Sequence, residues 1–290
     1  GGATLTSNAA TLTISAGGGS NPTGTLIWTG VVDTDWNAPC NWSPGSVPTA
    51  TNDVVIPNTA NKPIIGTAAV AQSVEVQAGA TLTINAAKSL TVNGSKFIDG
   101  FTSGVYNAGT IHNNGHLILG NVSSVGESGL TTTGTFNNNT GAEITIDRAT
   151  SEGVSNSGGV FANAGKMTIG ASASVGATGL YNNATFNNNT GGEITINRSS
   201  SSGLYNSVGG TFTNAAKISI GTTTPTLALG LENRAIFINN AGGEITINNT
   251  TAFGLINASG NLSMYPPGTF TNEGKISIGT TALSSIGLIN

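Results

Sequence analysis

The sequence predicts an all-β fold, a right-handed parallel β-helix (β-solenoid) with about 25 residues per coil and a Trp-rich segment near its N-terminus. Composition is the first reason, because only 8% of the 290 residues are charged and 42 are glycine, unlike ordinary globular domains. Local pattern is the second, because short β-type runs alternate with Gly-, Asn- and Ser-rich turns without helical periodicity. Repetition at constant spacing is the third.

Three short motifs recur in fixed order along the chain. They are Gly-(Leu/Val)-x-Asn, an aromatic residue followed two places later by Asn, and (Glu/Lys)-(Ile/Met)-(Thr/Ser)-Ile. The phenylalanines of the second motif are spaced 25, 25, 26, 25 and 33 residues apart, and an insertion at 258–268 fills the last gap. They are Phe136, Phe161, Phe186, Phe212, Phe237 and Phe270. Three runs per repeat predict three strands per coil.

Asparagine is expected to form two internal ladders, because side chains alternate faces along a strand and stacked coils align equivalent positions. An inward Asn amide would be costly alone but can bond the amides above and below it. The first ladder comprises Asn113, Asn138, Asn163, Asn188, Asn214, Asn239 and Asn272. The second comprises Asn107, Asn156, Asn182, Asn206, Asn233, Asn257 and Asn290.

Charged residues are expected to form one outward column in which Glu and Lys alternate. Its members are Glu143, Lys166, Glu193, Lys217, Glu244 and Lys275. An exposed pair is worth only about 0.2–1 kcal/mol, so we interpret the alternation as a device for register. A slip by one coil would stack like charges, which is unfavourable.

The N-terminal part differs from the coils. Residues 1–14 match 78–92, and 1–20 are expected to end a preceding repeat module of a longer protein. Residues 21–65 hold all three tryptophans and are expected to form a cap or junction, with a ligand pocket as the alternative. Residues 66–290 are expected to form the parallel β-helix coils.

Residues 25–95 resemble a segment of large secreted β-helix repeat proteins from gliding, type IX-secreting bacteria. The motifs that carry the resemblance are Trp28/Gly30, Asp33/Trp36, Asn41/Trp42, Gly45/Val47/Pro48 and Asp53/Val54/Ile56/Pro57. The resemblance implies an extracellular, surface-attached or released protein of the adhesin or surface-fibre type. It supplies no catalytic residue.

Several functional classes are disfavoured by the sequence. Nine Lys and Arg are spread along a chain of net charge −4, so nucleic acid is not an expected partner. No apolar run reaches the length of a membrane span. Cys40 has no His nearby, and His112 and His116 lack a neighbouring acid or Cys. No catalytic residue is therefore predicted, and the chain is not expected to be an enzyme.

No cofactor is predicted apart from a weak calcium candidate. Asp33 and Asp35 mimic the start of a calcium loop, but Ala38 and Pro44 stand where the EF-hand needs Gly and Glu.

Outward apolar and aromatic side chains are the candidate contact residues. Tyr106, Tyr181 and Tyr205 are expected to share one outer column that could bind glycan or a partner chain. Ile236, Ile238 and Ile256 are also expected to point outward, as residues of an interface do. Thr is frequent on two outer columns, which keeps ice binding open as a third function. Those columns hold Thr135, Thr185, Thr211 and Thr269, and Thr145, Thr168, Thr195 and Thr246.

The function favoured by the sequence is a non-catalytic structural repeat module of a giant extracellular adhesin or surface filament. The alternative is a carbohydrate-binding or polysaccharide-degrading β-helix. Expected partners are identical chains, other modules of the same long chain, and a cell-surface or glycan target.

Overall fold

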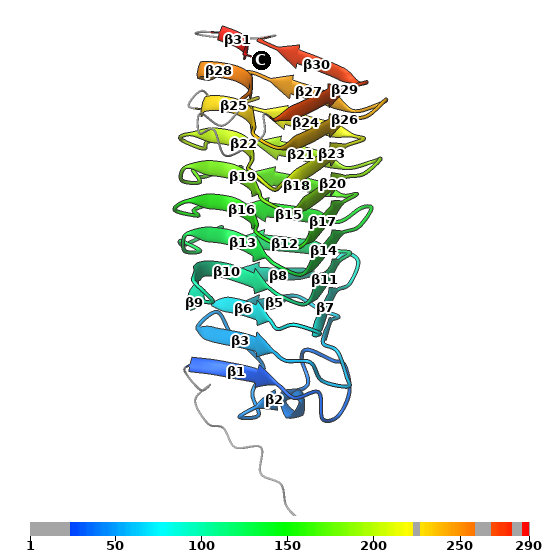
Figure 1. Cartoon of the computed structure of the whole chain (residues 1–290). Helices are drawn as coiled ribbons and strands as arrows, with labels where there is room; N and C mark the ends of the chain where they lie inside the picture. The colour runs from blue at the N-terminus through cyan, green and yellow to red at the C-terminus, as the bar shows by residue number, and fades with distance from the viewer. Residues whose placement is uncertain (1–23, 223–226, 259–267, 280–285, 290) are drawn as a thin grey trace, which may run out of the picture.

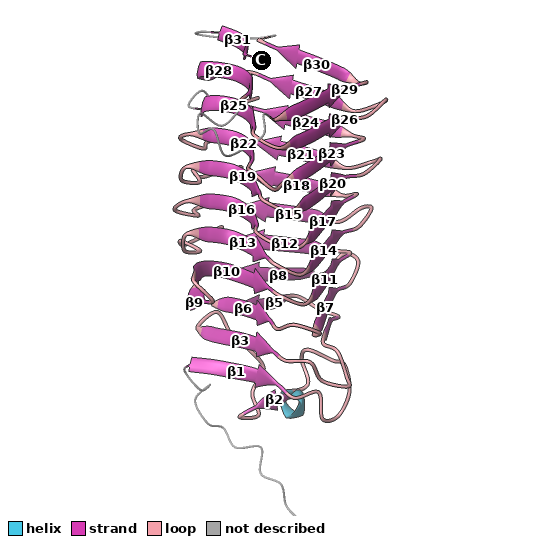
Figure 2. Cartoon of the chain, in the orientation of Figure 1, coloured by secondary structure: helices cyan, strands magenta, loops and turns pink. Residues whose placement is uncertain are grey.

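The computed structural model describes residues 24–222, 227–258, 268–279 and 286–289, and these form a right-handed β-solenoid (Figure 1). The predicted all-β fold class is confirmed. In the described residues the helical content is a single 3₁₀ turn, η1 (Pro39–Asn41), and Figure 2 shows strands in every coil. No helix among them is long and apolar enough to cross a membrane. The expected preceding module at 1–20, the ladder member Asn290 and most of the insertion at 258–268 lie outside the described residues.

Three sheets line the solenoid, and we call them sheets A, B and C. Sheet A has 13 strands: β2 (Trp42–Ser43), β1 (Gly24–Trp28), β3 (Asn52–Ile56), β6 (Ser73–Val76), β10 (Phe101–Asn107), β13 (Ser128–Thr132), β16 (Glu152–Asn156), β19 (Thr178–Asn182), β22 (Ser202–Asn206), β25 (Leu227–Asn233), β28 (Thr250–Asn257) and β31 (Ile286–Ile289), with β9 (Lys96–Ile98) paired to β10.

Sheets B and C have nine strands each. Sheet B contains β4 (Ile64–Ile65), β7 (Thr81–Ile84), β11 (Thr110–Asn113), β14 (Thr135–Asn138), β17 (Val160–Asn163), β20 (Thr185–Asn188), β23 (Thr211–Asn214), β26 (Ile236–Asn239) and β29 (Thr269–Asn272). Sheet C contains β5 (Ala69–Ala71), β8 (Ser89–Val92), β12 (His116–Leu119), β15 (Glu143–Ile146), β18 (Lys166–Ile169), β21 (Glu193–Ile196), β24 (Lys217–Ile220), β27 (Glu244–Ile247) and β30 (Lys275–Ile278).

Each regular coil contributes one strand to sheets A, B and C in turn, and neighbouring coils pair in parallel with equivalent residues aligned. Strand β21 illustrates the local cause. Ile194 and Ile196 point into the core while Glu193 and Thr195 face outward, as expected from the two-residue period of a strand. The same burial pattern recurs in β15, β18, β24 and β27.

Phenylalanines form a continuous stack inside sheet B. The six rings from Phe136 to Phe270 follow one another at centroid separations of 4.6–4.8 Å, with interplanar angles of 1–12°. These separations match the spacing of hydrogen-bonded strands, so ring stacking and backbone pairing hold the coils in the same register. The rings from Phe136 to Phe237 are fully buried.

Asparagine amides form the two expected ladders. In the first, each Nδ2 donates to the Oδ1 of the next coil at 2.7–2.8 Å, without a break from Asn113 to Asn272. The second runs from Asn156 to Asn257 with bonds of 2.8 Å. Asn107 reaches instead the hydroxyl of Thr132, which occupies the Asn position in its coil. Most of these amides also donate to a backbone carbonyl, for example Asn188 to Lys217 and Asn206 to Ile236.

Glycine is required where sheet A meets sheet C inside the solenoid. At Gly203 an added Cβ would lie 2.5 Å from Ile220 Cγ2 and 2.7 Å from the carbonyl oxygen of Gly230. Gly129, Gly153, Gly179, Gly230 and Gly254 have the same kind of contact with an isoleucine of sheet C. The Gly of the Gly-(Leu/Val)-x-Asn motif is therefore required by the close packing of sheet A against the isoleucines of sheet C.

The Trp-rich segment leads into the solenoid without a sharp boundary. β1 and β3 already pair in parallel as members of sheet A, so the first solenoid strands precede the boundary expected at residue 66. In the sequence β2 lies between these two strands, but in sheet A it pairs antiparallel with β1 on the side away from β3 (Figure 1). Edge coverage of this kind is what the expected cap requires.

Replacement of Asn188 by Ala is expected to lower the unfolding temperature clearly. The change leaves the buried Asn163 Nδ2 without its acceptor, and an unpaired buried group costs about 1–3 kcal/mol. It also removes one of the two donors to Asn214 Oδ1, which keeps the backbone N–H of Ala216. Thermal unfolding followed by circular dichroism measures the effect. Asn187→Ala on the outer side of the same strand is the control. Equal unfolding temperatures for the two variants would contradict a stabilising role for the ladder.

Replacement of Gly203 by Ala is expected to destabilise the coil more than an ordinary Gly→Ala change, because the new methyl would meet Ile220 and a backbone carbonyl at once. Gly158→Ala is the matched control, since its Cβ would find nothing closer than 3.9 Å. Chemical denaturation of both variants compares them. A Gly203→Ala midpoint equal to that of Gly158→Ala would show that this corner has room for a side chain.

Candidate functional site

The expected charged column lies on the outer face of sheet C. Strand register places Glu193 directly between Lys166 and Lys217, and the alternation continues from Glu143 to Lys275. None of these Glu and Lys side chains in the described residues comes within 4.0 Å of another, although Glu143 reaches Nδ1 of His116 at 3.3 Å. The column therefore alternates in sign without close ion pairs, which suits a role in register more than one in stability.

The weak calcium candidate is part of a braced loop. The carboxylate of Asp33 accepts hydrogen bonds from the Asp35 backbone N–H at 2.9 Å and from Asn41 Nδ2 at 2.6 Å. These two bonds, the backbone one first, hold the pKa of Asp33 below its ordinary value. Asp35 in turn accepts the backbone N–H of Asn37. Within the described part of the chain, no group of three or more His, Cys, Asp or Glu side chains could hold a metal ion.

The tryptophans form a small core of their own. Trp28 and Trp36 pack edge-on against Trp42 at centroid distances of 5.0 and 4.7 Å, and all three side chains are buried. Trp28 donates to the carbonyl of Asn61, and Trp42 donates to that of Trp36. The three rings therefore supply packing to this segment.

The tyrosine column exists on the outer face of sheet A, but its members differ in exposure. Tyr181 and Tyr205 lie on adjacent coils with ring centroids 5.6 Å apart, and Cζ of Arg234 lies over the Tyr205 ring, 5.6 Å from its centroid. Tyr106 was expected to be exposed and is instead only 5% exposed. The hairpin of β9 and β10 folds over it, so that Phe101 stacks on its ring at 6.0 Å.

The outward isoleucines do not share one surface. Ile236 is 46% exposed on sheet B, where Ile238 is half-buried beside it. Ile256 is half-buried on sheet A, in the same column as Tyr205.

The outward threonines likewise divide between two sheets. One column follows sheet B and is interrupted by Val160 and Ile236, and the other lies beside the charged column of sheet C. Neither is a continuous threonine surface.

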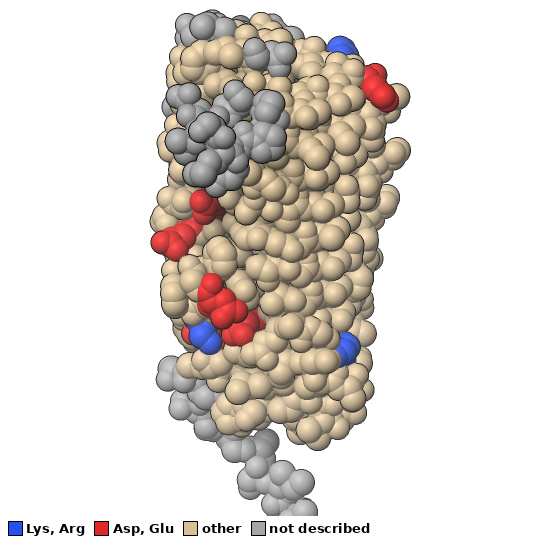
Figure 3. Space-filling model, in the orientation of Figure 1, with Lys and Arg blue, Asp and Glu red and all other residues tan. Residues whose placement is uncertain are grey.

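A polar hollow of about 500 Å³ opens on sheet A between Phe101 and Tyr181. In Figure 3 the acidic side chains on the face in view gather mainly at the left edge, where the sheet A strands lie in Figure 1. Two carboxylates, four serine hydroxyls, an amide and two aromatic residues line the hollow. They belong to Glu127, Glu152, Ser128, Ser151, Ser155, Ser157, Asn183, Phe101 and Tyr181.

Most of these lining residues were missed by the sequence analysis, which singled out only Tyr181. A usable signal was present in Asp99-Gly100 between β-type runs, since this dipeptide is a strong hairpin signal. Both residues have positive φ in the turn between β9 and β10. Glu127 and Glu152 stand outside the alternating column, which was a second signal.

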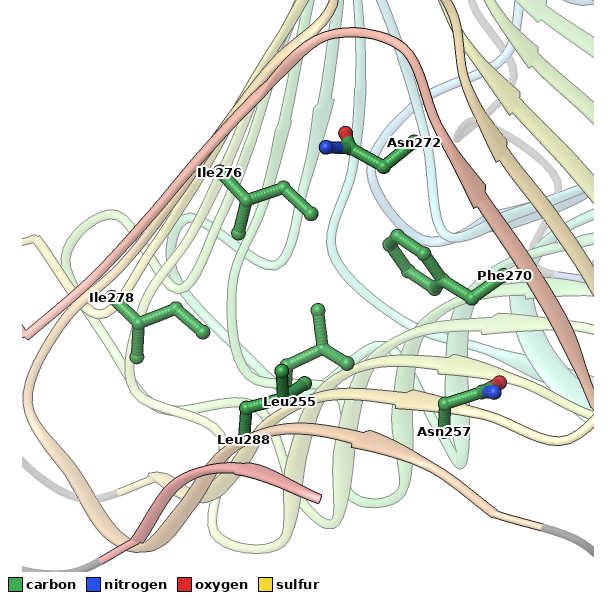
Figure 4. A pocket seen from close by; sticks show the side chains of 7 residues that line it. All are labelled: Leu255, Asn257, Phe270, Asn272, Ile276, Ile278 and Leu288. Carbon is green, nitrogen blue, oxygen red and sulfur yellow. The ribbon is translucent and has the colours of Figure 1, made fainter. Parts of the chain in front are cut away.

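A second hollow, of about 540 Å³, lies at the end of the solenoid core and has a different character (Figure 4). Its lining is the last residues of the internal files, which point toward one another: Leu255, Asn257, Phe270, Asn272, Ile276, Ile278 and Leu288. No ionisable group is among them, so these side chains supply packing and ladder contacts.

The fold and its ladders define the chain as a β-solenoid repeat protein. A family model described as "Domain of unknown function (DUF8693)" matches residues 27–152, the Trp segment and the first coils. No curated protein matches the chain. Among solved structures, "Crystal structure of TibC-catalyzed hyper-glycosylated TibA55-350 fragment" matches 92% of this chain and 100% of that one, with 13% identity and a TM-score of 0.20. At that score the likeness carries no argument.

Tyr106 is expected to ionise above its ordinary pKa of 10.0, because burial, and then its contact with the Asp99 carboxylate at 3.2 Å, disfavour the phenolate. A raised folded pKa means that its stabilising contribution is complete below pH 10 and is lost as pH rises through the folded value. Ultraviolet absorbance of phenolate during an alkaline titration measures this, with Tyr106→Phe as the comparison. Titration of every tyrosine near the ordinary value while the fold persists would contradict it.

Proposed function

We propose that this chain is a non-catalytic, rigid repeat module of an extracellular adhesin or surface filament. The observation that carries the proposal is the unbroken Asn113–Asn272 ladder beside the stacked phenylalanines. Each coil is tied to the next by backbone, amide and ring contacts at the same interval. Nine coils at the strand spacing extend roughly 40 Å, and a stiff element of this kind is suited to hold contact sites away from a surface.

The distribution of charge also supports a structural role. The glutamates of sheet C alternate with lysines on an exposed face, an arrangement unlike the paired carboxylates of glycoside hydrolases. Other acids have structural partners: Asp53 accepts from the Ser73 hydroxyl, and Asp147 accepts from Ser172.

Surface location is the part of this proposal that separates it from an intracellular repeat protein. Antibodies raised against the purified chain are expected to label intact cells that make the protein, or filaments shed from them. External protease is expected to remove the label, because an adhesin module is accessible from outside. Immunofluorescence before and after permeabilisation is the measurement.

An antibody to an abundant cytoplasmic protein is the control for intact membranes. Labelling only after permeabilisation would overturn the extracellular role. Release of reducing ends from polysaccharide by the purified chain would favour the polysaccharide-degrading alternative.

A further inference from the structure

The polar hollow on sheet A lies where the outward column changes side-chain size, beside Ser155 and Tyr181. Coil by coil, the register gives Tyr106, Thr131, Ser155, Tyr181 and Tyr205 at the same outward position. Two small residues thus lie between large aromatic ones. Tyr106 is covered by the hairpin and Thr131 is fully buried, so Ser155 is the small residue of this column that lines the hollow, between Phe101 and Tyr181. The volume of the hollow, about 500 Å³, lies within the range of small-ligand pockets.

The two ends of the hollow are aromatic, and each ring is held in place. Phe101 is positioned by the β9–β10 hairpin and stacks on Tyr106. Tyr181 packs edge-on against Tyr205, and the Tyr205 ring is in turn covered by Arg234. Rings fixed by their neighbours can offer a face to a ligand without losing much conformational entropy. Aromatic walls with a few placed polar groups are typical of small-ligand sites.

Between the aromatic ends lies an arranged set of hydrogen-bonding groups. Glu152 is half-buried, and its two carboxylate oxygens accept the hydroxyls of Ser128 and Ser151, each at 3.0 Å. Ser155 and Ser157 pair with each other at 2.9 Å. Glu127 and Glu152 both line the hollow, and a carboxylate oxygen can accept more than one hydrogen bond. A carboxylate held by two hydroxyls is oriented before the ligand arrives.

The sign of the charge selects the class of ligand. The lining contains Glu127 and Glu152 and neither Lys nor Arg. Acidic groups attract amines and accept from hydroxyls, whereas they repel carboxylated or sulfated chains. Aromatic faces bind apolar faces of sugar rings and, through cation–π contacts, ammonium groups.

We propose that this hollow binds a short stretch of an uncharged or amine-bearing glycan, with Glu152 as hydrogen-bond acceptor and Tyr181 as stacking platform. The proposal deepens the adhesin role by naming a contact site and its ligand class. Glycan binding is tested on the purified chain, so its failure is distinguishable from a failure of the proposed extracellular location.

The test is isothermal titration calorimetry of the whole chain with three probes: cellotetraose, a chitosan tetrasaccharide and an alginate tetrasaccharide. Binding of cellotetraose or the chitosan tetrasaccharide is expected, and the difference between them identifies neutral or amine-bearing glycan as the source. Preference for the alginate tetrasaccharide, or binding of none of the three, overturns the proposal.

Two variants and a control locate the binding. Ser155→Tyr continues the neighbouring tyrosine column and fills the hollow, so it is expected to abolish binding. Tyr181→Ala removes the platform and is expected to weaken binding about tenfold, the scale of a lost aromatic contact. Glu193→Gln on sheet C is the control and is expected to bind normally.

Circular dichroism confirms that each variant is folded. Binding that survives both Ser155→Tyr and Tyr181→Ala would place the ligand elsewhere and overturn the assignment.

Discussion

The structure depends on exact coil-to-coil register. Backbone pairing alone would tolerate a shift along the strand, since one strand edge resembles another. The inward amides remove that freedom, because each Asn must meet the Asn of the next coil or remain buried without a partner. Ring stacking at 4.6–4.8 Å likewise requires each Phe to align with the Phe of the next coil. Packing between sheets A and C restricts the register further, since only Gly203 and its equivalents allow sheet A to approach the isoleucines of sheet C.

This internal regularity leaves the outer faces free to differ. Sheet C carries alternating charges, sheet B is nearly uncharged, and sheet A carries the aromatic column with its acids. The candidate binding site arises where the repeat is least regular. The β9–β10 hairpin is an addition to its coil, and Thr131 and Ser155 interrupt a run of tyrosines. Equivalent turns of the regular coils form equivalent shallow hollows beside the charged column, whereas the hollow on sheet A has a lining that no other described coil repeats.

Much of the architecture could be predicted from residue patterns. The two-residue alternation in Glu193–Ile196 and the constant interval between phenylalanines were enough for the coil, the inward files and the Asn ladders. Prediction was poorer where non-local packing decides exposure. Tyr106 occupies an outward position, and only the folded hairpin covers it. Likewise, Glu127 and Glu152 are ordinary acids until Ser128 and Ser151 orient one of them beside Tyr181.

Periodicity by itself determined the fold class, the faces of each strand and the order of the ladders, because a local period repeated along the chain leaves only one way to bury the apolar residues. The tertiary structure alone decided which outward residues are covered and which line a hollow. The physical reason is the sequence separation over which each interaction acts. Alternation acts between neighbours in sequence, whereas the hollow brings together Phe101, Glu152 and Tyr181, which only stacking of successive coils makes adjacent.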